Sequence, residues 1–175
     1  PTETAMVNLG DKKGISAQEV RDACPRSSEV PFDSDRKLMS TFHKMKDGYT
    51  MITKGAVDVM LKRVDYIQKG GKIFPVTEVD VENICRVNEQ YSESGLRVLG
   101  IGYRHFPVEK NISTEDEQGL VFLGLLAMMD PPRTESAAAV SDCKRAGICP
   151  VMITGDHKVT AAAIAKRIGI LDDIS

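Results

Sequence analysis

The chain has 175 residues with a net charge of -2, of which 42% are hydrophobic and 27% charged, a composition typical of a globular protein. The near balance of charge, the absence of Trp and the 5% share of aromatic residues exclude a basic, base-stacking surface, so no nucleic-acid partner is predicted. No run of about 18 apolar residues occurs, which excludes a membrane-spanning helix, and four scattered cysteines predict reduced thiols packed as small core hydrophobes.

Two short helices are predicted at the start of the chain. Pro1–Leu9 has Pro in its first turn, an early acidic residue and apolar residues at helical spacing. Ser16-Ala-Gln-Glu19 has the form of a capping box and opens a second helix that ends before Pro25. Because the chain starts without Met, we expect it to be an excised domain.

The next segment predicts an antiparallel pair of strands and then a helix. We expect Glu29–His43 to pair with Gly48–Thr53, whose second half alternates polar and apolar residues. After Gly55, apolar residues at helical spacing predict an amphipathic helix that ends at Gly70-Gly71.

A longer helix is predicted from Thr77 to Gly95, with its apolar residues facing inward. Leu96–Phe106 predicts a strand, and the charged stretch Pro107–Gly119 predicts a loop whose acidic residues face solvent. The continuous apolar run Leu120–Met128 predicts a strand that is buried on both faces.

From Asp130 onward the pattern changes to alternating helices and strands, which is typical of a parallel, doubly wound sheet. A helix is expected over Pro132–Ala146, a strand over Cys149–Ile153 and a helix over Lys158–Ile168. A disulfide between Cys143 and Cys149 remains an alternative to free thiols. We therefore predict two domains, residues 1–128 and 129–175, with a hinge near residues 130–133.

The predicted strands place Phe32 close to a Lys that leads into the turn Gly55-Ala56. A flat ring beside a cation and an open glycine backbone suits a purine and its phosphates, since an aromatic ring stacks on a base and Lys attracts phosphate. An aromatic residue and a Lys on neighbouring strands are also common in proteins that bind no nucleotide, and this alternative stays open on spacing alone.

The tripeptide Thr154-Gly155-Asp156 follows a predicted parallel strand and precedes a helix. Ligands bind at the carboxyl ends of such strands, and the helix presents free N–H groups to an anion. Thr and Gly could hold phosphoryl oxygens there, while Asp could address a hydroxyl or a magnesium-bound water. An ordinary turn, in which Asp156 or Thr154 only caps the helix, is the alternative reading.

Five ordered motifs resemble P-type cation-transporting ATPases, over nearly the whole chain. They are Pro1-Thr-Glu3, Phe32-Asp-Ser-Asp-Arg-Lys-Leu-Met-Ser40, Lys54-Gly55-Ala56, Gly95-Leu-Arg-Val-Leu99, and Asp130-Pro-Pro-Arg133 with Met152-Ile-Thr-Gly-Asp156. The resemblance implies an α/β fold: an α+β nucleotide-binding domain with an antiparallel sheet flanked by helices, joined to a partial haloacid-dehalogenase-like parallel α/β domain.

The resemblance also implies a role for each matching residue. Phe32 would stack on adenine, Lys54 would line the adenine–ribose pocket, and Glu3 would accept the adenine amino group unless it only caps its helix. The apolar and backbone parts of the pocket would be Met39, Leu99, Gly55 and Ala56. Arg97 would meet phosphate, unless it is a strand Arg in solvent, and Thr154, Gly155 and Asp156 would address the γ-phosphate as catalytic residues.

One departure from the family pattern lowers the expected affinity. Calcium pumps of the vertebrate type carry Arg two residues after the stacking Phe, whereas this chain has Ser34. We therefore expect ATP binding in the high micromolar to millimolar range, roughly -4 to -5 kcal/mol. Strand alternation predicts that Arg36 shares the Phe32 face and that Lys37 points to the opposite face.

As a whole, the resemblance implies a cytoplasmic portion of a bacterial plasma-membrane pump, most similar to calcium pumps. The parent would use ATP and Mg²⁺ and form an aspartyl-phosphate, with its other domains and transmembrane helices as partners. The phosphorylated Asp-Lys-Thr-Gly-Thr and the magnesium motif are absent from this sequence, so no metal site and no hydrolysis are predicted here. The alternatives are a soluble haloacid-dehalogenase-like phosphatase with a cap domain, whose Asp-x-Asp pair would be Asp33-Ser-Asp35, and a non-catalytic nucleotide-sensing module.

Overall fold

The computed structural model describes residues 2–129, 132–154 and 158–171. The chain forms two compact units, one of Pro1–Arg86 with Val98–Leu126 and one of Val87–Arg97 with Ala127–Ser175. The predicted division between residues 128 and 129 stays a prediction, and two residues of the predicted hinge, Asp130 and Pro131, lie outside the described residues. Within the described residues, no helix is both long and apolar enough to cross a membrane.

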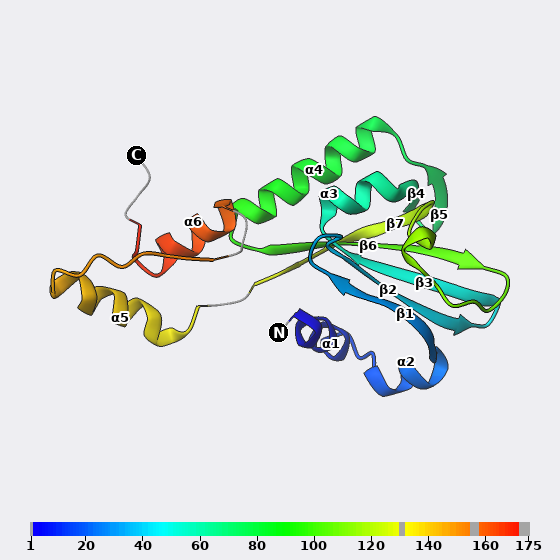
Figure 1. Ribbon diagram of the computed structural model, residues 1–175, viewed down its shortest axis with the longest axis horizontal. Helices are drawn as coiled ribbons and strands as arrows, with labels where there is room; N and C mark the ends of the chain where they lie inside the picture. Colours follow the sequence, from blue (N-terminus) through cyan, green and yellow to red (C-terminus); the bar gives the residue numbers. More distant parts are fainter. Residues whose placement is uncertain (1, 130–131, 155–157, 172–175) are drawn as a thin grey trace. The chain divides into compact units, whose positions relative to one another are not determined.

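A seven-stranded sheet organises the first unit (Figure 1). Its strands, in spatial order, are β1 (Arg26–Asp33), β2 (Leu38–Met45), β3 (Gly48–Gly55), β6 (Arg97–Phe106), β7 (Leu120–Met128), β4 (Val64–Lys69) and β5 (Lys72–Pro75). The pairs β1–β2, β2–β3, β3–β6 and β4–β5 are antiparallel. Because β4 pairs with β7 in parallel, the sheet is mixed, and the predicted α/β class is confirmed.

Short helices precede and interrupt the strands. The first two are α1 (Thr2–Lys12) and α2 (Ala17–Ala23), and the N-cap of α2 is Ser16, whose hydroxyl accepts the N–H of Glu19 at 3.3 Å. The capping residue read from the sequence is thereby confirmed. The others in this unit are α3 (Val57–Met60) and the 3-10 helices η1 (Leu61–Arg63) and η2 (Thr114–Asp116).

The core lies on one face of the sheet, under α3. Leu38, Phe42 and Met51 are fully buried there, and Phe42 stacks on the ring of Tyr49 at 5.3 Å. Met60 of α3 packs against β6, where two strand residues are glycines: a Cβ on Gly100 or Gly102 would lie 3.3 Å from its side chain. The other face of these strands, called the open face below, carries side chains that are half-buried, such as Met39 and Lys54.

Two predicted elements are wrong in the first half of the chain. Glu29–His43 is two strands, because Asp33 accepts three backbone N–H groups and turns the chain at residues 34–37. The expected helix after Gly55 ends after two turns, and β4 and β5 follow as a hairpin. Both residues of Gly70-Gly71 have positive φ, 55° and 79°, so they form the hairpin turn that the sequence reading took for a helix end.

The helix α4 (Glu78–Glu93) begins with a reciprocal cap. The Thr77 hydroxyl accepts the Asp80 N–H at 3.3 Å, while the Asp80 carboxylate accepts the Thr77 N–H at 3.2 Å and its hydroxyl at 2.8 Å. Lys69 of β4 donates to the same carboxylate at 2.5 Å. At the other end Gly95, with φ 76°, closes the helix as predicted.

Asp80→Asn is expected to destabilise the chain at neutral pH more than at acid pH. Hydrogen bonds from Lys69 and then from Thr77 hold the pKa of Asp80 below its usual value, although burial opposes them. The ionised carboxylate therefore adds stability above the unfolded pKa of about 3.9, and this contribution disappears as pH falls through the lower folded pKa. Thermal unfolding from pH 3 to pH 7 measures it, with the exposed Glu82→Gln as control. A difference from wild type that stays constant over this range would contradict the assignment.

The second unit contains α5 (Thr134–Arg145) and α6 (Lys158–Arg167), close to the predicted helices. The predicted strand Cys149–Ile153 is wrong: these residues have no regular secondary structure, and Val151 and Ile153 are 76% and 94% exposed. Isolated strands are unstable, and no described strand pairs with this segment. Cys143 and Cys149 are free thiols, so the alternative of a disulfide is wrong. The prediction that the cysteines are buried in the core is also wrong, because two of the four are half-buried and two are exposed.

Candidate functional site

The predicted nucleotide-binding residues of the first unit gather at one end of four neighbouring strands. Phe32 lies one residue before the end of β1, and Met39 is the second residue of β2. Met39 lies opposite Lys54 of β3, which lies opposite Ile101 of β6. Residues directly opposite one another in a sheet share a face, so these three side chains form a row on the open face.

Lys54 is held in this row by a carboxylate from α1. Its ammonium lies 2.5 Å from both carboxylate oxygens of Glu3. The Lys54 side chain is 20% exposed and that of Glu3 is 68% exposed. An exposed ion pair of this kind contributes little to stability, about 0–1 kcal/mol. Its main consequence is geometric, because it brings together two residues that are 51 positions apart and that the sequence predicts for one pocket.

Gly55 is required by a close backbone approach. A Cβ at this position would lie 2.1 Å from the carbonyl oxygen of Lys37 and 2.8 Å from the Leu38 side chain. The next residue, Ala56, donates its N–H to the same Lys37 carbonyl at 3.1 Å. The turn that follows Phe32 therefore rests directly on the Gly55-Ala56 segment.

The remaining predicted residues of the pocket differ in exposure. The Phe32 ring is 63% exposed, which is unusual for an aromatic side chain and leaves its face accessible. Met39, Leu99 and Ala56 are half-buried. Arg97 is the exposed first residue of β6 and belongs to the second unit, so its role stays a prediction.

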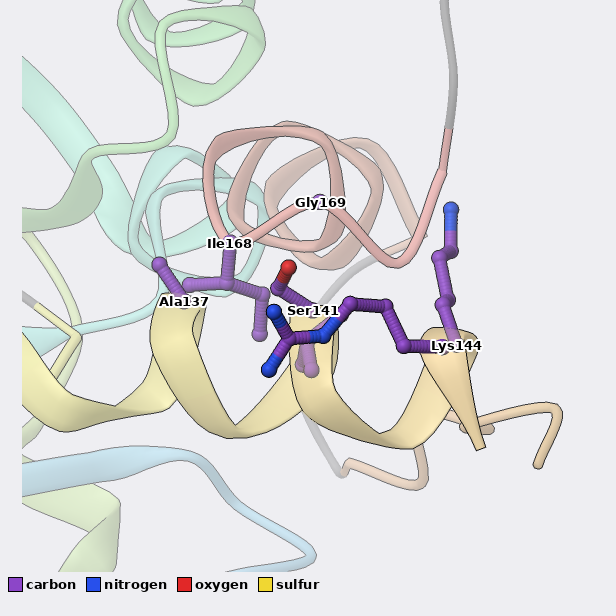
Figure 2. Close-up of a pocket in the computed structure, with 7 residues that line it drawn as sticks. Ala137, Ser141, Lys144, Ile168 and Gly169 are labelled. Carbon is purple, nitrogen blue, oxygen red and sulfur yellow. The ribbon is translucent and has the colours of Figure 1, made fainter. Parts of the chain in front are cut away.

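The predicted phosphate residues of the second unit are only partly described. Thr154 is exposed and lines a hollow of about 730 Å³, together with residues of α6 and of the segment before it. Gly155 and Asp156 lie outside the described residues. Figure 2 shows a second hollow of this unit, of about 470 Å³, between α5 and the end of α6. It is lined by residues that include Ser141, Lys144 and Gly169, and the sequence motifs assign none of these three to a site.

Sequence reasoning missed a buried ion pair beside the pocket. Arg36 donates to Glu117 at 2.5 Å, and their side chains are 11% and 0% exposed. The prediction that the acidic residues of Pro107–Gly119 face solvent is therefore wrong for Glu117. The prediction that Arg36 and Lys37 alternate as in a strand is also wrong, because both lie in the turn and Lys37 has a φ of 56°. One sequence signal could have indicated that Glu117 is buried: it lies three residues before the apolar strand β7, whose first three residues are buried.

The Asp-x-Asp pair of the phosphatase alternative has a structural role in the same turn. Asp33 accepts the N–H groups of Asp35 and Arg36 at 3.0 and 2.8 Å through one carboxylate oxygen. This is the geometry of an Asx turn. Among the described residues, no group of three or more His, Cys, Asp or Glu side chains could hold a metal ion.

Comparisons with known proteins identify the family of this chain. The family model described as P-type ATPase, cytoplasmic domain N, matches residues 1–135. Calcium-transporting ATPases of Listeria monocytogenes and Bacillus cereus are 44% and 43% identical over 98% and 99% of this chain. The sodium/potassium-transporting ATPase subunit alpha of Hydra vulgaris is 35% identical over 98% of it.

These alignments cover 20%, 20% and 18% of the three relatives, so the chain spans about a fifth of their length. The family model, in contrast, matches well over half of the chain itself. The chain therefore belongs to the P-type ATPase family, and residues 1–135 correspond to its cytoplasmic domain N.

Proposed function

We propose that this chain is the ATP-binding part of a pump that couples ATP hydrolysis, through an aspartyl-phosphate, to cation transport. The observation that carries the proposal is the row Met39, Lys54 and Ile101, with Glu3 on Lys54 and the exposed ring of Phe32 at the same end of the strands. Calcium is the proposed ion, because relatives named as calcium-transporting ATPases are 44% and 43% identical to the chain.

Each side chain offers adenosine one kind of contact. The exposed Phe32 ring provides a stacking surface, worth about 1–3 kcal/mol for a base. Lys54 provides a positive charge beside the ribose and phosphates. Glu3 can release Lys54 at little cost, since their ion pair is exposed, and can accept the adenine amino group. Met39 and Leu99, both half-buried, supply apolar contacts at the edge of the base.

The residues that would contact the phosphates of ATP are proposed from the sequence motifs. Arg97 is exposed at the start of β6, and a guanidinium can bind two phosphate oxygens at once. Thr154, Gly155 and Asp156 are proposed to address the γ-phosphate. ATP is proposed to be used together with Mg²⁺, whose protein ligands are proposed to lie mostly outside this chain.

Several parts of this function are proposed to lie in other segments of the pump. The sequence holds no Asp-Lys-Thr-Gly-Thr motif, so this chain alone is expected to hydrolyse no ATP, and Ser34 in place of Arg is expected to make its ATP binding weak. The proposed partners are the other domains and transmembrane helices of the pump, with the chain on the cytoplasmic side of a bacterial plasma membrane.

An ATP titration of the 175-residue chain, followed by NMR or calorimetry, tests the proposal. We expect wild-type binding in the high micromolar to millimolar range and a loss of about tenfold or more for Phe32→Ala and Lys54→Ala. The matched controls are Phe74→Ala, an exposed aromatic residue of β5, and Lys46→Ala, in the β2–β3 turn; both should bind as wild type does. Binding that ignores the Phe32 and Lys54 substitutions would place the pocket elsewhere, and no binding at tens of millimolar ATP would contradict the proposal.

A further inference from the structure

The ion pair Arg36–Glu117 is buried and has no part in the proposed binding mechanism. Glu117 is fully buried, and its Oε1 accepts from Arg36 at 2.5 Å and from the Ser40 hydroxyl at 2.6 Å. The Ser40 hydroxyl also lies 2.8 Å from that of Thr53, which directly precedes Lys54. Glu117 Oε2 is buried and has no hydrogen-bond partner in the described part of the chain. Arg36 is therefore the counter-charge of the buried Glu117 carboxylate.

Arg36 connects this buried carboxylate to the segment Pro31–Lys37, which comprises the end of β1 with Phe32 and the turn that follows it. Its second guanidinium nitrogen donates to the carbonyl of Pro31 at 2.5 Å, and Pro31 directly precedes Phe32. The Arg36 N–H is held by the Asp33 side chain at 2.8 Å. At the end of the turn, the Lys37 carbonyl accepts the N–H of Ala56. One guanidinium thus joins Pro31, at the start of this segment, to the buried Glu117. The end of the segment contacts Gly55-Ala56 through the Lys37 carbonyl.

A direct role of Arg36 at phosphate is disfavoured by the same geometry. Its side chain is 11% exposed, and two of its donor groups are engaged. Moving Arg36 to a ligand would leave a buried carboxylate without its counter-charge, which is strongly destabilising. Any effect of Arg36 on ligand binding must therefore act through the position of Phe32 and of Gly55-Ala56.

We propose that Arg36 and Glu117 are positioning residues of the adenine site. They hold the segment Pro31–Lys37 so that the exposed side chain of Phe32 is ready to stack before a nucleotide arrives. Such preorganisation raises affinity because the cost of ordering the turn is met during folding rather than during binding. This inference rests on the proposed function, namely that Phe32 stacks on adenine.

Two measurements on Glu117→Gln separate positioning from plain stability. The chain has no Trp, so Phe32→Trp places a single fluorescent reporter on the turn. In this background, Glu117→Gln should make the reporter more accessible to acrylamide. It should also weaken adenosine and ATP equally, by about fivefold to tenfold, since stacking is common to both. Arg36→Lys serves as the second variant, because one ammonium cannot replace a guanidinium that bridges Glu117 and the Pro31 carbonyl.

Asp80→Asn is the matched control, because it removes a carboxylate that also forms an ion pair, at the start of α4. It should lower thermal stability without changing acrylamide quenching or nucleotide affinity. Folded Glu117→Gln or Arg36→Lys proteins with unchanged quenching and affinity would overturn the positioning role. A loss for ATP that clearly exceeds the loss for adenosine would overturn it as well, since Arg36 would then meet phosphate directly. If the wild-type chain binds neither ligand, the proposed function itself fails, whereas the preceding outcomes leave that function intact.

Discussion

Arg36→Met is expected to lower the free energy of unfolding by about 3–5 kcal/mol, the range seen when one partner of a buried ion pair is removed. Glu117 is fully buried, and without Arg36 its carboxylate keeps, among the described residues, only the Ser40 hydroxyl as a hydrogen-bond donor. Urea unfolding followed by circular dichroism measures the loss. The slope with denaturant should be nearly unchanged, because a local change in one turn alters little of the surface that unfolding exposes.

Two further variants make the Arg36 prediction specific. Arg26→Met removes the same side chain from the exposed pair Arg26–Glu29, whose side chains are 53% and 40% exposed, and should cost less than about 1 kcal/mol. The double variant Arg36→Met with Glu117→Leu should recover most of the stability, since an apolar pair can replace a buried ion pair at little cost. A single variant no less stable than Arg26→Met would show that the Glu117 charge is compensated in another way.

Gly55→Ala is expected to cost about 3 kcal/mol, the upper end of the range for overpacking, and to weaken ATP binding as well. The added methyl group would lie 2.1 Å from the Lys37 carbonyl oxygen, and a backbone atom cannot move aside as a side chain can. The turn would have to separate from β3, which would also break the hydrogen bond from Ala56 to Lys37.

Gly124→Ala is the matched control for this effect. Gly124 is also a strand glycine, and a Cβ there would meet no atom within 4 Å. Its replacement should leave stability within about 1 kcal/mol of wild type or raise it slightly, because Ala restricts the unfolded chain more than Gly does. Equal losses for both variants in thermal unfolding would mean that strand glycines matter here for a reason other than the contact with Lys37.

Sequence reasoning predicted the elements whose signals are local. The Ser16 cap, the glycine end at Gly95 and the strand β6 each depend on residues within a few positions of one another, and all three occur. The hairpin β4–β5 was missed because Val64, the first residue of β4, continues the helical spacing of Val57, Met60 and Leu61, which do form α3 and η1. The pairing of Val64 with Leu120, which decides between helix and strand, spans 56 positions and leaves no local signal.

In the candidate site, too, the residues that belong to sequence motifs were predicted, whereas their partners in packing and ion pairing were not. The motifs that name Phe32, Lys54 and Gly55 can be read directly, and the structure gathers these residues at one end of the sheet. The ion pairs Lys54–Glu3 and Arg36–Glu117 join residues 51 and 81 positions apart. Helical or strand periodicity does not predict contacts between residues so far apart in the sequence. The side chains that orient the site can therefore be identified only from the structure.

The order of the strands has a consequence for the synthesis of this chain on the ribosome. The hairpin β4–β5 emerges before β6 and β7, yet its only neighbour in the sheet is β7, which begins at Leu120. The antiparallel ribbon β1–β2–β3 can form early from nearby residues, whereas the hairpin stays at the far edge without a partner until two more strands have been made. Long-range, parallel pairing of this kind folds slowly. Until Leu120–Phe122 leave the exit tunnel, the edge of β4 that pairs with β7 has no partner, and we expect this unpaired edge to favour aggregation of the nascent chain during that interval.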